Sequence, residues 1–240
     1  MPLPQFRPWK GDEPYTYALG VFPALEAFAA ACAIQAIILP EKPEPNEGIS
    51  TLKQYAEERS IPVILGDRLL ERLSGKENCL AIAVVQRQKQ TLDSKCEHLV
   101  LERPSDQGNL GTILRTALGF GLHNVAIVGG GTDPDHPRVI RASMGARFHL
   151  SIARFASAQD YGAAFQRPIA SLRLDGTTFL EDFSWPSPVS LVLGNEASGL
   201  SPDWNQAQHS IRIRHESSID SLNLAIAAGI VLHEWSRRRR

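Results

Sequence analysis

This sequence contains little cysteine, no long apolar run and no excess of basic charge, and each of these features excludes a class of protein. The three cysteines, Cys32, Cys79 and Cys96, are odd in number and far apart, which argues against a disulfide framework or a CxxC zinc site. No apolar run approaches the roughly 20 residues that cross a bilayer. The histidines form no HxxxH-type pair, and no cluster of metal-ligating residues is visible. The sequence therefore predicts no membrane span, no metal site and a reducing, cytoplasmic setting.

Charge is balanced overall but unevenly distributed. The 25 Lys and Arg residues against 26 Asp and Glu residues give a net charge of −1, which by itself demands no nucleic-acid partner. Residues 101–240 nevertheless contain 14 Arg and no Lys. Arginine presents a planar fork that suits phosphate and carboxylate groups, although codon bias explains the same composition. The first residues lack a basic segment followed by an apolar one, so no secretory signal is expected.

The 240 residues, 43% of them hydrophobic, supply enough apolar material for one large or two small domains. A polar run over residues 86–95 has the composition of a linker and marks the predicted boundary. The predicted organisation is as follows: an irregular lead-in over 1–16, a small α/β domain over 17–88, a linker over 89–96, the main domain over 97–236 and a basic tail over 237–240.

From residue 97 onward, strand-like and helix-like segments alternate, which indicates a mainly parallel sheet covered on both faces. The predicted strands are 98–101, 124–128, 149–154, 169–174, 189–193 and 209–213. The predicted helices are 110–120, 137–145, 158–166 and 222–235. In such sheets, ligands bind at the loops that follow the carboxyl ends of the strands.

Three of these loops are unusually polar or rich in glycine. The first, residues 103–115, is expected to open a helix at residue 110 with Asn109 as its N-cap. Free N–H groups and the helix dipole at this point favour an anion, and Arg115 lies about 600° further round the helix. The segment contains neither GxGxxG nor GxxxxGK[ST], so a capped helix with a solvated arginine is the plain alternative.

The second loop follows a predicted buried strand and contains Gly194, Asn195 and Glu196. Glycine at a strand end allows a ligand to approach the backbone closely. The glutamate is either a functional group or a partner of the next helix dipole. An ordinary turn between strand and helix is the alternative.

The third loop leads to a helix that is expected to begin at Leu222, with Asp220 or Ser221 as the N-cap. Asn223 would then fall inside the helix, where asparagine is unfavourable. Its presence indicates a specific partner, and a mere contribution to capping is the alternative.

In this order, the three segments closely resemble the motifs of the SpoU (TrmH) family of RNA ribose methyltransferases, within the SPOUT superfamily. The first motif is an Asn, a Gly two residues later and Arg-Thr-Ala; the second is Gly-Asn-Glu followed by Gly; the third is Ser-Leu-Asn opening a helix with Ala. The matching residues are Asn109, Gly111 and Arg115 to Ala117, then Gly194 to Glu196 and Gly199, then Ser221 to Asn223 and Ala227. The match spans about residues 97–236, and residues 17–88 resemble the small substrate-binding domain that many members carry.

The resemblance implies an α/β fold with a C-terminal parallel-sheet SPOUT domain, which contains a deep trefoil knot, and a small N-terminal α/β substrate-binding domain. It also implies S-adenosylmethionine as the cofactor and a homodimer with the active site at the subunit interface. The cofactor would be held around Leu193, Gly194, Ile213 and Leu222. Arg115 would be the main catalytic residue, with Asn109, Glu196, Ser221 and Asn223 around it.

These residue types suit the implied chemistry. A ribose 2′-hydroxyl must lose its proton as it attacks the methyl group of the cofactor, and arginine stays protonated at neutral pH. Arg115 is therefore expected to grip a substrate phosphate and to place the hydroxyl. A phosphate oxygen, Glu196 or another neighbour would take the proton, and the sequence leaves these alternatives open.

The implied function is S-adenosylmethionine-dependent methylation of a ribose 2′-hydroxyl in structured RNA. Ribosomal RNA is preferred over tRNA because an additional domain suits a folded target. Where the family usually has Ile-Pro-Met before the third motif, this chain has Ile213, Arg214 and His215. Loss of the proline predicts a looser loop around the cofactor. The alternative function is therefore a non-catalytic RNA-binding relative that has lost cofactor affinity, while a Rossmann-type oxidoreductase is disfavoured because no GxGxxG follows the first strand.

Overall fold

The computed structural model describes residues 6–216 and 218–238, and the chain divides into two compact units. One unit comprises Met1–Gln88 with Asp133–His149, and the other comprises Lys89–Thr132 with Leu150–Arg240. The sequence prediction kept 97–236 together, so residues 133–149 differ from it in belonging to the first unit. The predicted lead-in, 1–16, lies partly outside the described residues.

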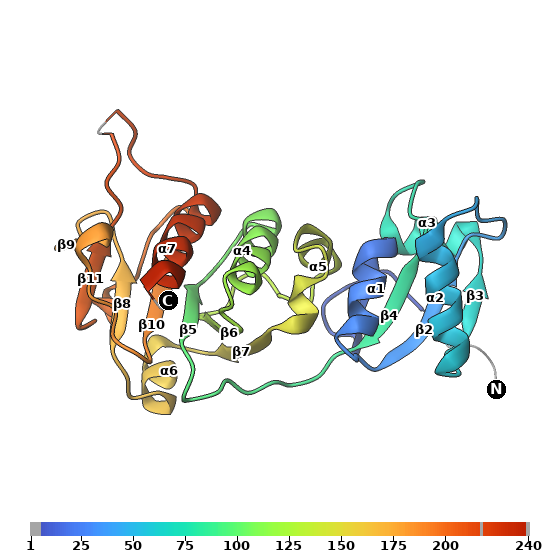
Figure 1. Cartoon of the computed structure of the whole chain (residues 1–240), viewed down its shortest axis with the longest axis horizontal. Coiled ribbons are helices and arrows are strands. Elements are labelled where there is room, and N and C mark those ends of the chain that lie inside the picture. The colour runs from blue at the N-terminus through green and yellow to red at the C-terminus, as the bar shows by residue number, and fades with distance from the viewer. Residues whose placement is uncertain (1–5, 217, 239–240) are drawn as a thin grey trace. The chain divides into compact units, whose positions relative to one another are not determined.

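The first unit is built on a four-stranded mixed sheet (Figure 1). Its strand order is β1-β4-β2-β3; β4 pairs antiparallel with β1 and β2, and β2 pairs parallel with β3. Three helices, α1, α2 and α3, connect these strands. The bounds are β1 Tyr15–Leu19, α1 Val21–Ala29, β2 Ile34–Leu39, α2 Glu47–Glu58, β3 Val63–Leu65, α3 Asp67–Ser74 and β4 Ile82–Gln86. Strand β1 has no counterpart in the sequence prediction, which placed its first residues in the irregular lead-in.

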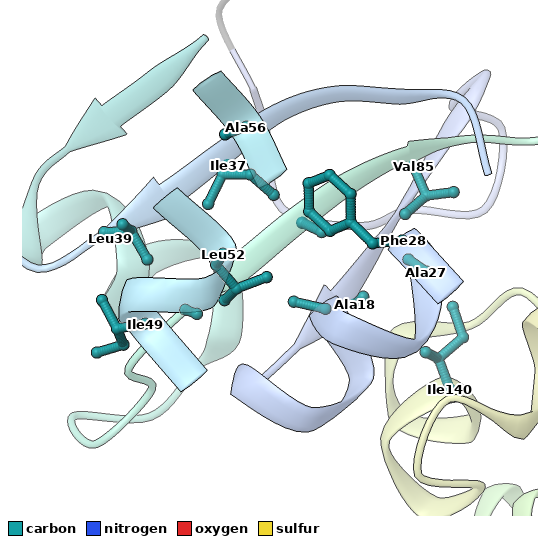
Figure 2. Packing of buried hydrophobic residues seen from close by; sticks show 13 residues of the cluster. Ala18, Ala27, Phe28, Ile37, Leu39, Ile49, Leu52, Ala56, Val85 and Ile140 are labelled. Atoms are coloured by element: carbon teal, nitrogen blue, oxygen red, sulfur yellow. The ribbon is translucent and has the colours of Figure 1, made fainter. Parts of the chain in front are cut away.

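The sheet contributes side chains to two hydrophobic cores, one on each face, because successive side chains of a strand point to opposite sides. In β4, Ala83 and Val85 join the core that contains residues of α1 and α2, whereas Ile82 and Val84 join the core that contains residues of α3. Figure 2 shows the first of these cores, with Phe28 of α1 among its members.

The returning segment 133–149 is fastened to the first unit by apolar burial and by ion pairs. Ile140, from helix α5 (Pro137–Ala142), is fully buried in the same core as Phe28 (Figure 2). Asp135 lies 3.2 Å from Arg87 Nε and 2.8 Å from Arg147 Nε. The short 3-10 helix Ala146–His149 completes the segment. Residues 133–149 thus connect two strands of the second unit but pack in the first unit. A strand–helix–strand pattern in the sequence does not show in which unit the helix packs.

The second unit contains a seven-stranded parallel sheet in the order β7-β6-β5-β10-β8-β11-β9 (Figure 1). Each pair of neighbouring strands in this order is parallel. The bounds are β5 His98–Glu102, β6 Asn124–Val128, β7 Ser151–Phe155, β8 Ile169–Leu172, β9 Thr178–Phe179, β10 Ser190–Leu193 and β11 His209–Arg212. The short strand β9 was not predicted, since two residues carry no periodicity.

Helices α4 (Gln107–Gly119), α6 (Ala158–Ala164) and α7 (Leu224–Arg238) belong to this unit, and α4 packs against α7. Within α7, the apolar residues divide: Ala228, Val231 and Leu232 are fully buried, whereas Ile226 is 58% exposed. The predicted basic tail begins inside the last turn of α7, where Arg238 bonds to Glu234; residues 239–240 lie outside the described residues. Among the described helices, none has the length and apolarity needed to cross a membrane.

The buried His98 makes the stability of the second unit pH-dependent. Its Nε2 lies 2.9 Å from the carbonyl oxygen of Asp93, which only accepts, so Nδ1 is the acceptor for the Tyr161 hydroxyl at 2.8 Å. Burial lowers the pKa of His98 from 6.5 to about 4. The stability linked to this neutral histidine is therefore complete above pH 6.5 and is lost as the pH falls towards 4, in total about 3 kcal/mol.

We expect urea unfolding between pH 7 and pH 4 to show this loss in the wild type and a flatter profile in His98→Gln. The difference between the two profiles removes the contribution of the carboxylates, which titrate in both proteins. Parallel profiles would contradict the assignment.

Candidate functional site

The loop after β5 and the start of α4 present Asn109 differently from the sequence prediction. The helix begins at Gln107, and its N-cap is Asp106, whose carboxylate accepts a hydrogen bond from the Asn109 backbone N–H at 2.7 Å. The prediction of Asn109 as the N-cap is therefore wrong. Because Asp106 caps the helix, the amide side chain of Asn109 is released to bond to other loops.

The loop after β10 is folded tightly around Asn195. Asn195 and Gly199 exchange backbone hydrogen bonds of 3.0 and 2.9 Å, and the Asn195 side chain donates to the carbonyl oxygen of Arg103 at 2.7 Å. A Cβ atom at Gly194 would lie 2.4 Å from the carbonyl carbon of Gly199, so only glycine fits there. The first glycine of the Gly-Asn-Glu-x-x-Gly pattern is thus required by a close crossing of the backbone at Gly199 and Leu200.

Glu196 joins this loop to the first one. Its carboxylate accepts hydrogen bonds from the Ser105 hydroxyl at 2.7 Å, the Ser105 N–H at 3.2 Å, the Asp106 N–H at 3.4 Å and the Asn109 amide at 3.4 Å. Partial burial alone would raise the pKa of Glu196, but these donors hold it below its ordinary value. At neutral pH the side chain is an anion whose lone pairs are already engaged, which suits a structural fastening better than proton transfer.

Asn223 brings in the third loop. It is the residue before α7, and its side-chain oxygen accepts from the N–H groups of Ala225 and Ile226 at 2.9 and 3.3 Å, so it acts as the N-cap. The predicted helix start at Leu222 and the predicted caps Asp220 and Ser221 are corrected accordingly. Asn223 Nδ2 also donates to Asn109 Oδ1 at 3.1 Å. Glu196, Asn109 and Asn223 therefore form one hydrogen-bonded chain across three loops.

These loops enclose a cavity of about 550 Å³, here called the motif cavity. It lies beyond the carboxyl ends of β8, β10 and β11, where parallel sheets bind ligands. Apolar and polar groups share its wall, as in small-molecule sites of this size. All predicted site residues except Arg115 line it: Asn109, Leu193, Gly194, Glu196, Ile213, Ser221, Leu222 and Asn223.

Arg115 is exposed on α4 and does not line the motif cavity of its own chain. Within the described part of the chain its side chain has no hydrogen-bonding or ionic partner. The structure thus gathers the other predicted residues and leaves this arginine on the surface, with its guanidinium available to a further molecule.

A fourth loop, after β8, was not singled out from the sequence. Arg173 and Asp175 line the motif cavity, and Arg173 donates to Asp175 at 3.1 Å and to Asn205 at 3.0 Å. The available signal was the Asp-Gly pair at the end of a strand. A Cβ atom at Gly176 would lie 2.5 Å from the Ile211 carbonyl carbon, so this glycine also marks a close crossing.

The Arg214 and His215 loop is held by side chains instead of by proline. The Arg214 guanidinium lies 3.8 Å from the centre of the Phe179 ring, and its Nε donates to Glu181 at 2.9 Å. His215 lines the motif cavity with its Nδ1 3.0 Å from the Ile213 carbonyl oxygen. The expectation of a looser loop rested on the missing proline alone and took no account of these contacts.

Among the described residues, no group of three or more potential ligands could hold a metal ion.

Comparison with known proteins agrees with this geometry. The sequence profile of the SpoU rRNA methylase family matches residues 97–233. An uncharacterized tRNA/rRNA methyltransferase of Mycolicibacterium paratuberculosis is 30% identical over 99% of this chain and 82% of its own length. The 23S rRNA (uridine(2479)-2′-O)-methyltransferase of Streptomyces viridochromogenes is 33% identical over 59% of this chain and 52% of its own length. The chain thus spans about half the length of the curated relatives that are 33–34% identical to it.

Among solved structures, an AdoMet-bound rRNA methyltransferase from Sinorhizobium meliloti has the same fold. The two chains superpose with a TM-score of 0.80 and 26% identity, over 94% of this chain and 88% of the other. The similarity therefore includes both units of the chain, each of which has a counterpart in that structure.

Proposed function

Because this chain belongs to the SpoU rRNA methylase family, we propose that it transfers a methyl group from S-adenosylmethionine to a ribose 2′-hydroxyl of structured RNA, with ribosomal RNA as the first choice. The observation that carries the proposal is the chain of hydrogen bonds from Glu196 through Asn109 to Asn223, which assembles the three family motifs around one cavity. The name of the Streptomyces relative supports the 2′-O position and ribosomal RNA.

The motif cavity fits the proposed cofactor. Its walls combine the apolar side chains of Leu193, Ile213 and Leu222 with the bare backbone at Gly194, where a ligand can approach closely. These four residues would hold the cofactor, which supplies an electrophilic methyl group on a sulfonium sulfur when bound. The AdoMet bound to the Sinorhizobium protein supports this choice of cofactor.

The polar residues have separate roles in the proposal. Glu196 fastens the loops and is not the proton acceptor, because its pKa is lowered and its oxygens already accept five hydrogen bonds. Asn109, Ser221 and Asn223 line the cavity wall and orient the attacking ribose. Arg115 grips the phosphate beside that ribose with both arms of its fork. The proton of the hydroxyl then passes to a phosphate oxygen or to water.

Arg115 reaches a reacting ribose in the proposed homodimer, where it faces the motif cavity of the partner subunit. Two observations support this arrangement: Arg115 is exposed on α4, and the adjoining groove between α4 and α7 is apolar. Ile226 and Ile230 of α7 line that groove and are 58% and 38% exposed. We also propose that the second unit contains the trefoil knot that the resemblance implies.

The dimer yields a direct prediction. Ile226→Asp places a charge in the apolar groove, so we expect sedimentation to show a monomer of about 26 kDa and methyl transfer to be lost. Leu80→Asp, on the first unit and 47% exposed, is the matched control and is expected to leave the assembly unchanged. A wild-type monomer at micromolar concentration would refute the dimer.

The proposed function is tested by methyl transfer from labelled S-adenosylmethionine to fractionated total RNA. We expect label in ribosomal RNA, without added metal, at a site where alkaline hydrolysis fails to cleave the following phosphodiester because the 2′-oxygen is blocked. Label on a base would overturn the ribose assignment. Calorimetry with the demethylated cofactor separates an enzyme from a non-catalytic relative, since the latter binds no cofactor.

A further inference from the structure

Arg103, the first residue after β5, has a backbone conformation that side chains rarely adopt. Its φ is +47°, in the left-handed region. Its N–H donates to the Val128 carbonyl oxygen at 2.9 Å, and its own carbonyl oxygen accepts from the Asn195 amide at 2.7 Å. Glycine adopts this conformation without strain. An arginine here therefore carries a conformational cost that needs a reason.

The neighbouring loop is shaped around this side chain. Gly129, after β6, has a φ of +73°, and a Cβ atom there would lie 3.0 Å from Arg103 Cγ. At Gly131 a Cβ atom would lie 2.5 Å from the Pro104 carbonyl oxygen. The glycines leave room for the arginine stem and for the backbone that follows it.

The contacts of the guanidinium within the described chain do not account for the residue type. Nη2 lies 3.4 Å from the Ser198 hydroxyl, and Nε lies 3.7 Å from Glu102 Oε1, both long distances. The other oxygen of Glu102 already accepts a 2.8 Å bond from the Ser201 N–H. Nε itself is buried without a hydrogen-bond partner. Since Ser198 lines the motif cavity and the Arg103 side chain is 43% exposed, the two Nη groups lie at the rim of that cavity.

We propose that Arg103 is an RNA phosphate-binding residue at the rim of the motif cavity, in addition to the predicted site residues. The proposal rests on the proposed function, since it assumes an RNA substrate. A rigid, planar fork on a strained backbone suits a phosphodiester adjacent to the ribose that enters the cavity. Strained residues persist where function requires them, and binding to phosphate positions the RNA without reading its bases.

The backbone strain provides a sharp test. Arg103→Gly relieves the φ while it removes the guanidinium, so we expect an unchanged or higher Tm together with a KM for RNA that is raised roughly tenfold or more. Arg103→Lys keeps the charge. We expect its RNA binding to have the salt dependence of the wild type, while its KM for RNA stays raised as in the glycine variant. Arg237→Ala removes one charge from the end of α7, away from the cavity, and serves as the matched control.

Unmodified ribosomal RNA transcribed in vitro is the probe. Filter binding over a range of KCl concentrations is expected to give a slope of log Kd against log salt that is smaller by about one in Arg103→Gly. Calorimetry with the demethylated cofactor is expected to give an unchanged Kd. A wild-type KM and slope in the glycine variant would overturn the proposal, as would a parallel loss of cofactor affinity, which would assign Arg103 to the cofactor.

Failure of the proposed function is separate from failure of this inference. If the wild type transfers no methyl group to the transcript, the proposed function is contradicted, while the salt slopes of the two proteins still decide whether Arg103 binds phosphate. If the wild type methylates the transcript and the glycine variant does so equally well, only the role of Arg103 is wrong.

Discussion

Arg115→Ala is expected to lower methyl transfer by about 10²-fold or more while cofactor affinity and Tm stay close to those of the wild type. The proposed loss follows from removing a charge-assisted, bidentate contact that positions the phosphate beside the reacting ribose. The unchanged stability follows from the exposure of Arg115 on α4, where it has no bonding partner among the described residues. Single-turnover methyl transfer, thermal unfolding and calorimetry with the demethylated cofactor measure the three quantities.

Arg115→Lys separates charge from geometry. A lysine keeps the positive charge but offers no planar fork, so its turnover is expected to stay near that of the alanine variant. Thr112→Ala, one turn earlier on the same helix, also lies at the groove between α4 and α7, and it is the control for disturbance of both the helix and the proposed dimer contact. Near-wild-type turnover of the lysine variant would contradict the role assigned to Arg115.

The fold of the second unit follows from its sequence because buried parallel strands are continuous apolar runs with polar loops after them. The predicted strands 124–128 and 189–193 coincide with β6 and β10 to within a residue. The three loops that carry the site were predicted for the same reason, since ligand sites of parallel sheets lie after the strands. Their contact through Glu196 and Asn109 required knowledge of the strand order, which no local pattern contains.

Other features depend on choices between local alternatives. Asp106 and Asn109 are both good N-caps, and the structure uses the earlier one because Asn109 is bonded to Glu196 and Asn223. Residues 133–149 have the pattern of a crossover helix, but Ile140 is buried in the core of the first unit. The residues of the site are thus predictable from the sequence. Its hydrogen bonds, and the unit in which each connecting segment packs, are decided by tertiary packing.

Glu196→Gln is expected to weaken cofactor binding, on the order of tenfold, together with a large loss of methyl transfer. The wild-type carboxylate accepts bonds from Ser105, Asp106 and Asn109, all of which are donors. A glutamine would turn its own N–H₂ group towards some of these donors and leave them without an acceptor. The loops after β5 and β10 would then separate. Because these loops form walls of the motif cavity, the cavity would lose its shape.

The cofactor Kd distinguishes this fastening role from general base catalysis. A base that acts only on the ribose hydroxyl would lower turnover in Glu196→Gln and leave the Kd of the demethylated cofactor unchanged. Because hydrogen bonds lower the pKa of Glu196, the anion that fastens the loops is present above the ordinary carboxyl pKa and is lost only as the pH falls through the lowered value. We therefore expect the wild-type cofactor Kd to stay constant from neutral pH down to about 5, and a Kd that rises near pH 7 would contradict the assignment.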